Sequence, residues 1–219
     1  MPYDIMSFII SCLLILAYFL HLERLTRLSP SSSIHKLNTL IREQWVDMIM
    51  SNGKLEILAI QTLRNSVMAA SFMATTAVLL IVGSLNLSNQ IEHWAIIWHS
   101  SFGTWHPALP ADTTTVSWQI KLTLLVLVFF VAFFCFSMSI RFFNHVGYMI
   151  TLPCDKTTNL TQYKQTCAYM NKAGSYYRFG TRIFFFSLPI TLWFFSPCLL
   201  ILATLGLIGG LKMIDKVPS

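Results

Sequence analysis

The sequence predicts an all-α, polytopic membrane protein with four transmembrane helices and amphipathic helices on the cytoplasmic side. First, 55% of its 219 residues are hydrophobic and only 11% are charged, whereas a soluble domain carries about 25% charged residues. Second, four long stretches are apolar and close to the length that a helix needs to cross a bilayer. We therefore expect one membrane domain over residues 1–219.

The first expected span is apolar apart from Ser7, Ser11 and His21, and the fourth contains Pro189 and Pro197. These prolines predict a tilted or kinked fourth helix. The 29 uncharged residues of that stretch are too few for two crossings, because each crossing needs about 20 residues. The four spans cover residues 5–22, 64–87, 119–141 and 183–211.

Basic residues alternate between the connections. Six of the 15 Lys and Arg residues lie between the first two apolar stretches and six between the last two, while residues 85–119 contain none. Lys and Arg are retained in the cytoplasm during insertion, so the loop 142–182 is expected inside and the loop 86–117 outside. Four spans then place both termini outside the cytoplasm, in the cell (inner) membrane, although Lys212 and Lys216 after the last span favour the inside.

Residues 33–50 are expected to form an amphipathic helix, because apolar residues recur there at helical spacing. The stripe consists of Ile34, Leu37, Ile41, Trp45 and Met48. With Lys36 and Arg42 beside the stripe, the helix suits the cytoplasmic surface of the bilayer. An equal alternative is that the stripe packs on the protein's own helices.

A second stripe lies in the loop 142–182. It consists of Leu160, Tyr163, Cys167 and Met170. Gly174 and Gly180 follow this stripe, so we expect a bend before the fourth span.

Polar residues gather at the expected cytoplasmic ends of spans two, three and four. Helical spacing turns each set to one face. If these faces meet, they form an Arg-rich pocket at the inner leaflet for an anionic lipid head group or another anion, because guanidinium groups bind phosphate and carboxylate. The alternative is that the arginines reach lipid phosphates while the amides join helices. The candidates are Arg64, Asn65, Arg141, Asn144, His145, Arg178 and Arg182.

Small residues at intervals of four predict close helix packing, either within the bundle or between chains. These residues are Ser66, Ala70 and Ala74 in the second span and Gly206 and Gly210 in the fourth. A four-helix bundle has few internal faces, so we expect at least one contact with another membrane protein chain.

The outer loop holds three histidines that could bind a metal: His93, His99 and His106. Their intervals of six and seven residues do not match a closed metal site, so histidines at the membrane boundary are the alternative. The sequence implies no cofactor.

No catalytic motif is present, so we expect no enzyme, although His145 could serve as a base in lipid modification. Asp4 and Asp215 lie at the ends of the chain and the other acids in connections, which predicts no buried relay of carboxylates. The net charge of +6 flanks apolar spans. It therefore predicts lipid rather than nucleic acid as the partner.

Three motifs resemble an uncharacterised membrane protein family, domain of unknown function 599 (DUF599). They are LAIQTLRNSVMAASF at 58–72, SIRFFNHVGYMI at 139–150 and YYRFGTRIFFFSLPITLWFFSP at 176–197. The resemblance covers nearly the whole chain. It implies a small polytopic membrane protein and supplies no established activity.

Three classes of function follow. The first is a structural or accessory subunit of a homo- or hetero-oligomeric membrane assembly, with the Arg-rich pocket binding anionic lipid. The second is an oligomeric, anion-selective pore or transporter. The third is a metal-binding or redox accessory protein that uses the outer histidines.

Overall fold

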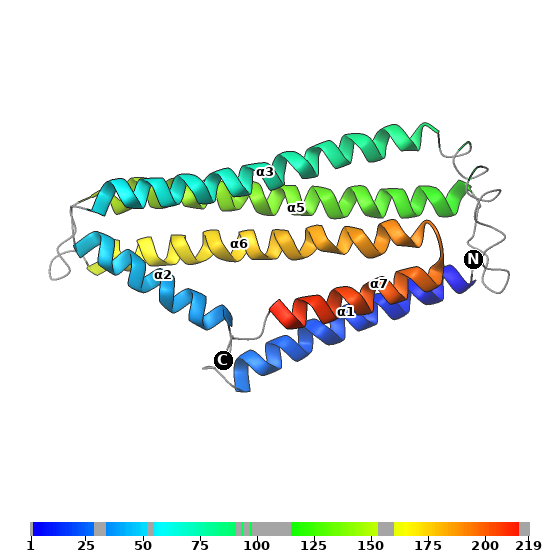
Figure 1. Ribbon diagram of the computed structural model, residues 1–219, viewed down its shortest axis with the longest axis horizontal. Coiled ribbons are helices and arrows are strands. Elements are labelled where there is room, and N and C mark those ends of the chain that lie inside the picture. The colour runs from blue at the N-terminus through cyan, green and yellow to red at the C-terminus, as the bar shows by residue number, and fades with distance from the viewer. Residues whose placement is uncertain are drawn as a thin grey trace. The chain divides into compact units, whose positions relative to one another are not determined.

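The computed structural model describes residues 2–28, 34–51, 55–90, 93, 97, 115–152 and 160–214. Within these ranges the chain is helical and contains no strand, which confirms the all-α class. The helices are α1 (Pro2–Leu28), α2 (Ile34–Ser51), α3 (Glu56–Ser88), α5 (Thr115–Ile150), α6 (Leu160–Trp193) and α7 (Pro197–Ile214) (Figure 1).

Helices α3, α5 and α6 are longer than the spans that the sequence predicts. They contain 33, 36 and 34 residues, or roughly 50 Å each at about 1.5 Å per residue. Among the described residues, Glu56–Ser88 and Val116–Ile150 are long and apolar enough to cross a membrane. Asp4–Tyr18 and Pro197–Met213 are shorter apolar helices. The structure thus supplies two helices of spanning length.

The chain divides into two compact units. Unit 1 comprises Met1–Ser33, Val78–Phe130 and Ile183–Ser219, and unit 2 comprises Ile34–Ala77 and Val131–Arg182. Helices α3, α5 and α6 each contribute one part to each unit. The two units differ in the partners of their cationic side chains, as described below.

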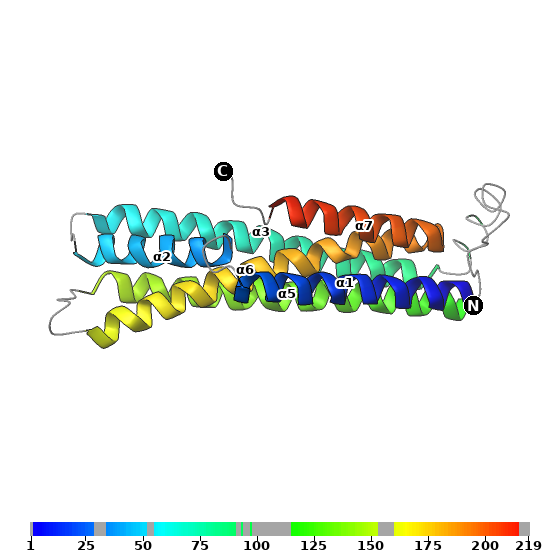
Figure 2. The same ribbon diagram turned by 90° about the horizontal axis from the view of Figure 1, so that it is seen from below.

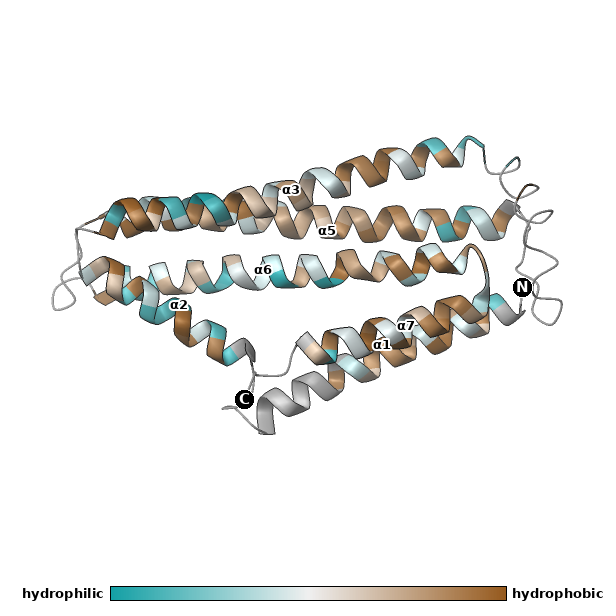
Figure 3. Ribbon diagram, in the orientation of Figure 1, coloured by the Kyte–Doolittle hydropathy of each residue, from teal (hydrophilic) through white to brown (hydrophobic). Residues whose placement is uncertain are grey.

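In unit 1, α1 and α7 lie side by side (Figure 1), and Figure 2 shows the same helices from below. Leu125 and Phe129 of α5 pack with Ile190 of α6, and the ring of Phe129 lies 5.8 Å from that of Phe184. Figure 3 shows that hydrophobic residues dominate α5 and α7.

Helix α1 buries polar residues and exposes apolar ones. Its buried face carries Asp4, Ser7 and Ser11, whereas Ile5 and Leu13 are 56% and 59% exposed. A helix in water buries its apolar stripe and exposes its polar one. In lipid, apolar residues can face outward and polar residues join helices inside.

The apolar stretch 183–211 is not one kinked helix, as predicted, but two helices. Helix α6 ends at Trp193 and α7 begins at Pro197, after which the chain runs back (Figure 1). The Ser196 hydroxyl accepts a hydrogen bond from the Cys198 N–H at 3.3 Å, which caps α7. Proline suits the first helical position because no backbone donor is needed there. Pro189 lies inside α6 without ending it.

In unit 2, α2 packs on α3, α5 and α6 through its fully buried Val46 and Ile49. Of the predicted stripe, Trp45 packs against this cluster, whereas Leu37, Ile41 and Met48 are 40%, 52% and 47% exposed. The stripe is therefore divided between packing on the protein's own helices and an outward face. The helix turns an apolar face outward.

Helix α6 is continuous from Leu160 to Trp193, so Gly174 and Gly180 do not interrupt it. Gly180 provides space for a neighbouring helix. A Cβ atom there would lie 3.0 Å from the Cys135 Cβ and 3.1 Å from the Phe136 ring. The missing side chain lets α6 approach α5 closely.

Candidate functional site: a cationic pocket in unit 2

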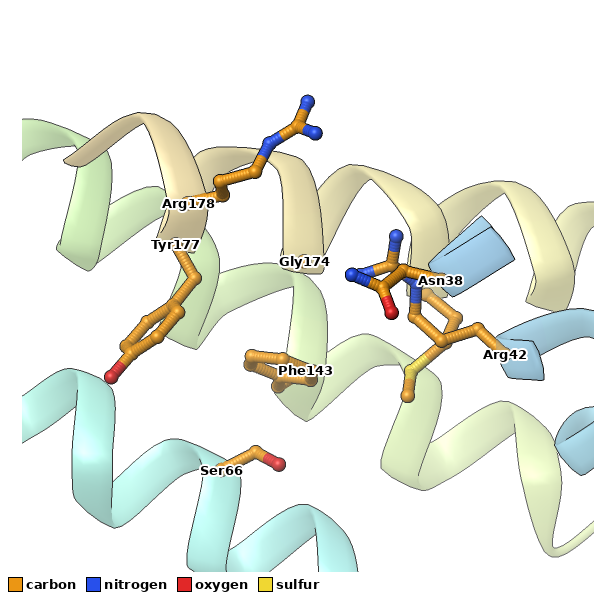
Figure 4. Close-up of a pocket in the computed structure, with 8 residues that line it drawn as sticks. Asn38, Arg42, Ser66, Phe143, Gly174, Tyr177 and Arg178 are labelled. Carbon is orange, nitrogen blue, oxygen red and sulfur yellow. The ribbon is translucent and has the colours of Figure 1, made fainter. Parts of the chain in front are cut away.

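Unit 2 contains a cavity of about 330 Å³ between its helices. Helix α2 contributes two of its lining residues, α3 and α5 one each, and α6 the other four (Figure 4). The lining residues are Asn38, Arg42, Ser66, Phe143, Met170, Gly174, Tyr177 and Arg178.

Arg42 is held in place by a neutral amide. Its Nε donates a hydrogen bond to Asn171 Oδ1 at 3.2 Å, and Asn171 Nδ2 donates to Glu43 Oε1 at 3.0 Å. Burial lowers the pKa of Arg42 from its usual value, while the nearby Glu43 charge raises it. Arginine remains charged at any physiological pH. A fixed positive charge therefore lines the cavity.

Gly174 makes room for this guanidinium group. A Cβ atom at Gly174 would overlap Arg42 Nη1 and lie 2.8 Å from Arg42 Cζ. No described glycine has a positive φ, so space rather than backbone conformation explains this glycine. Arg42 thus crosses α6 at a turn where a side chain would displace it.

The lining residues supply hydrogen-bond donors and no carboxylate. Arg42 and Arg178 carry guanidinium groups, and Asn38 and Tyr177 add an amide and a hydroxyl. In Figure 4 the Arg178 side chain extends to the opposite side of α6 from Tyr177. The Arg42 guanidinium group can bind an oxyanion through charge-assisted hydrogen bonds. The lining has no carboxylate, histidine or cysteine to serve as general base or nucleophile.

Only one of the seven residues predicted for an anion pocket lines this cavity, namely Arg178. Arg182 is buried, at 8% exposure. The other five are exposed: Arg64, Asn65, Arg141, Asn144 and His145.

Asn38 and Arg42 were missing from the predicted pocket. The apolar stripe of α2 suggested that Arg42 flanks a membrane-facing surface, but the helix packs through the neighbouring face. The usable signal was Gly174, whose missing side chain marks a close approach on α6.

The residues predicted for helix packing occupy different environments. Ala70 and Ala74 are buried, at 0% and 7% exposure, whereas Ser66 is partly buried and lines the pocket. Added Cβ atoms at Gly206 and Gly210 would meet nothing within 4 Å. These two glycines therefore leave open space beside α7.

Of the outer-loop histidines, His93 is exposed, and His99 and His106 lie outside the described residues. The described part of the chain holds no group of three or more His, Cys, Asp or Glu side chains that could bind a metal.

These features define a helical protein with two helices apolar enough to cross a membrane. It also has a cationic pocket in unit 2. The chain belongs to the family described as "Protein of unknown function, DUF599", whose model matches residues 6–218. The resemblance seen in the three motifs is thereby confirmed. No curated protein and no solved structure matches the chain.

Proposed function

We propose that this protein is an integral membrane protein that binds the phosphate of an anionic lipid head group in the unit 2 pocket. The observation that carries the proposal is the partly buried Arg42 guanidinium group, which is hydrogen-bonded to a neutral amide and lines a cavity whose lining has no carboxylate. A partly buried positive charge in such a cavity favours an anionic ligand.

The cavity suits a head group because of its size and because Arg42 is already held in position. Its volume of about 330 Å³ lies at the lower end of the range for small-molecule sites. Asn171 holds Arg42 in position before any ligand arrives. Less conformational entropy is then lost when the ligand binds.

A lipid fits better than a soluble anion because of the surface next to the pocket. Helix α2 carries Asn38 and Arg42 into the pocket, while Leu37, Leu40 and Ile41 are exposed on the same helix. An amphipathic helix of this kind suits the boundary between head groups and acyl chains. The pocket would then open where lipid phosphates lie.

We also propose that the C-terminus lies in the cytoplasm, in place of the outside position expected from four spans. If α7 returns through the membrane after Ser196, Lys212 and Lys216 follow an inward crossing, as the charge rule requires. A cysteine at Ser101 should react with an impermeant thiol reagent in intact cells, and one at Ser219 only after lysis. Labelling of both in intact cells would reject this topology.

In this proposal the protein works by binding, without turnover. The lining residues lack the acid and base groups that most catalysis uses. A role as an accessory subunit fits such a site, with the bound lipid forming part of the contact to other membrane protein chains.

Native mass spectrometry in mild detergent tests the proposal. We expect the protein to retain phosphatidylglycerol in preference to phosphatidylcholine, and Arg42→Ala to reduce this retention about 10-fold or more, since a hydrogen bond between charged groups is lost. Arg64→Ala is the matched control, because Arg64 is exposed and does not line the cavity. Equal retention by the parent and Arg42→Ala would reject the pocket.

A further inference from the structure

Unit 1 contains a buried ionic cluster formed by Asp4 of α1, Lys121 of α5 and Trp193 of α6. Lys121 Nζ donates hydrogen bonds to Asp4 Oδ1 at 3.2 Å and to the Trp193 carbonyl oxygen at 3.4 Å. Trp193 Nε1 donates to the same Asp4 oxygen at 3.0 Å. The Lys121 ammonium also lies 4.9 Å from the centre of the Trp193 ring, which stacks on Phe8.

The cluster is shielded from its surroundings. The Lys121 and Asp4 side chains are 1% and 6% exposed. Lys121 is among the largest side chains that are fully buried in the described residues. The position of Asp4 at the chain end gave no indication that its carboxylate is buried. Paired charges can be buried, but removal of one partner leaves the other uncompensated.

The sequence context shows why Lys121 needs a partner. Residues 85–119 carry no Lys or Arg, so Lys121 is the first basic residue after the loop expected outside the cell. A lone cation at this end opposes the tendency of basic residues to stay in the cytoplasm. Asp4 comes before the first apolar stretch, with no basic residue ahead of it. Together the two residues form a neutral pair.

We propose that the Asp4–Lys121 pair fixes the position in which the N-terminal helix α1 docks onto α5 and α6. We call this role an assembly latch. The pair forms only when the first turn of α1 meets the start of α5 and the end of α6. If α1 docked in another position, the Asp4 carboxylate and the Lys121 ammonium would each be desolvated without the other. The latch therefore selects one docked position of α1, and this role is independent of the pocket in unit 2.

Two neighbouring polar atoms provide matched controls. Ser11 Oγ and Trp118 Nε1 are buried and have no hydrogen-bond partner among the described residues. Ser11 lies two turns after Asp4 on α1, and Trp118 one turn before Lys121 on α5. Neither atom can contribute a specific bond to docking. Ser11→Ala should therefore leave α1 in place.

The test compares Asp4→Asn, Lys121→Met and the double variant in the full chain. We expect each single substitution to lower the apparent unfolding temperature by about 6–20 °C, because a buried charge loses its partner. The double variant should recover at least half of the summed loss. If the single variants fail to fold, recovery of monodisperse protein in the double variant is the readout.

A distance measurement reports docking directly. Spin labels at the exposed residues Met6 and Val116, in a chain without other cysteines, should give a narrow distance distribution in the parent protein and in Ser11→Ala. The distribution should broaden in Asp4→Asn and narrow again in the double variant. Additive losses of stability, or an unchanged distribution in both single variants, would overturn the latch.

Discussion

Unit 1 buries a cation completely and unit 2 buries one in part, and the two cations have different partners. In unit 1 the Lys121 ammonium lies 3.2 Å from the Asp4 carboxylate, and both side chains are buried. In unit 2 the Arg42 guanidinium is bonded to the neutral Asn171 amide and lines a cavity without a carboxylate. The first charge is satisfied within the protein. We propose that the second is available to a ligand.

The difference separates a structural charge from a binding charge. A neutralised buried pair contributes little affinity for an outside anion, and its loss is felt as a loss of stability. A guanidinium group held by an amide keeps its full charge, and its loss should be felt mainly in binding. The same kind of substitution should therefore have opposite consequences in the two units.

The largest expected effect is on stability in unit 1. Lys121→Met leaves the Asp4 carboxylate buried beside Trp193, and should cost about 3–5 kcal/mol of unfolding free energy. Retention of phosphatidylglycerol per folded molecule should not change. Thermal unfolding followed by native mass spectrometry measures both quantities. A selective loss of lipid with no loss of stability would reverse the comparison.

The next effect is on binding in unit 2. Arg42→Ala should reduce phosphatidylglycerol retention about 10-fold or more, because its guanidinium group lines the cavity. The unfolding temperature should change little, since the fully buried Val46 and Ile49 still dock α2. Arg42→Lys keeps the charge but not the planar fork, and should give an intermediate result. If Arg42→Ala instead unfolds the protein, Arg42 belongs to the structural class.

A smaller effect is expected from Gly174→Ala. The added methyl group would overlap Arg42 Nη1, the end of a flexible side chain, so the guanidinium group should move while the fold persists. We expect retention of phosphatidylglycerol to fall roughly 3-fold to 10-fold, through partial loss of a charged hydrogen bond. Gly206→Ala is the control, because an added Cβ there meets nothing within 4 Å. Equal retention by the two variants would show that Arg42 need not cross α6 at this turn.

Sequence patterns were sufficient for what depends on one helix at a time. Hydrophobic length and helical spacing predicted the all-α class, and the family motifs predicted the family. The tertiary details were not accessible, because hydropathy does not distinguish a kinked helix from a helix, a capped turn and a second helix. Ser196 and Pro197 carried the cap signal inside an apolar run.

Of the seven residues predicted for an anion pocket, Arg178 lines the unit 2 cavity and the other six do not. Charged side chains at helix ends are common, and the sequence alone could not distinguish exposed arginines such as Arg64 from the partly buried Arg42. The Asp4–Lys121 pair joins residues separated by 117 positions, so no local pattern could reveal it. Its only trace was a lone cation beside a loop otherwise free of basic residues.

The most direct test gives unit 2 the charge arrangement of unit 1. The double variant Asn171→Asp with Glu43→Gln leaves the net charge unchanged and places a carboxylate where the Arg42 Nε bond now ends. Phosphatidylglycerol titrated into both proteins and followed by native mass spectrometry should show about 10-fold weaker retention in the variant, with stability equal or higher. Undiminished retention would contradict the claim that Arg42, bonded to an amide rather than directly to a carboxylate, binds the anionic ligand.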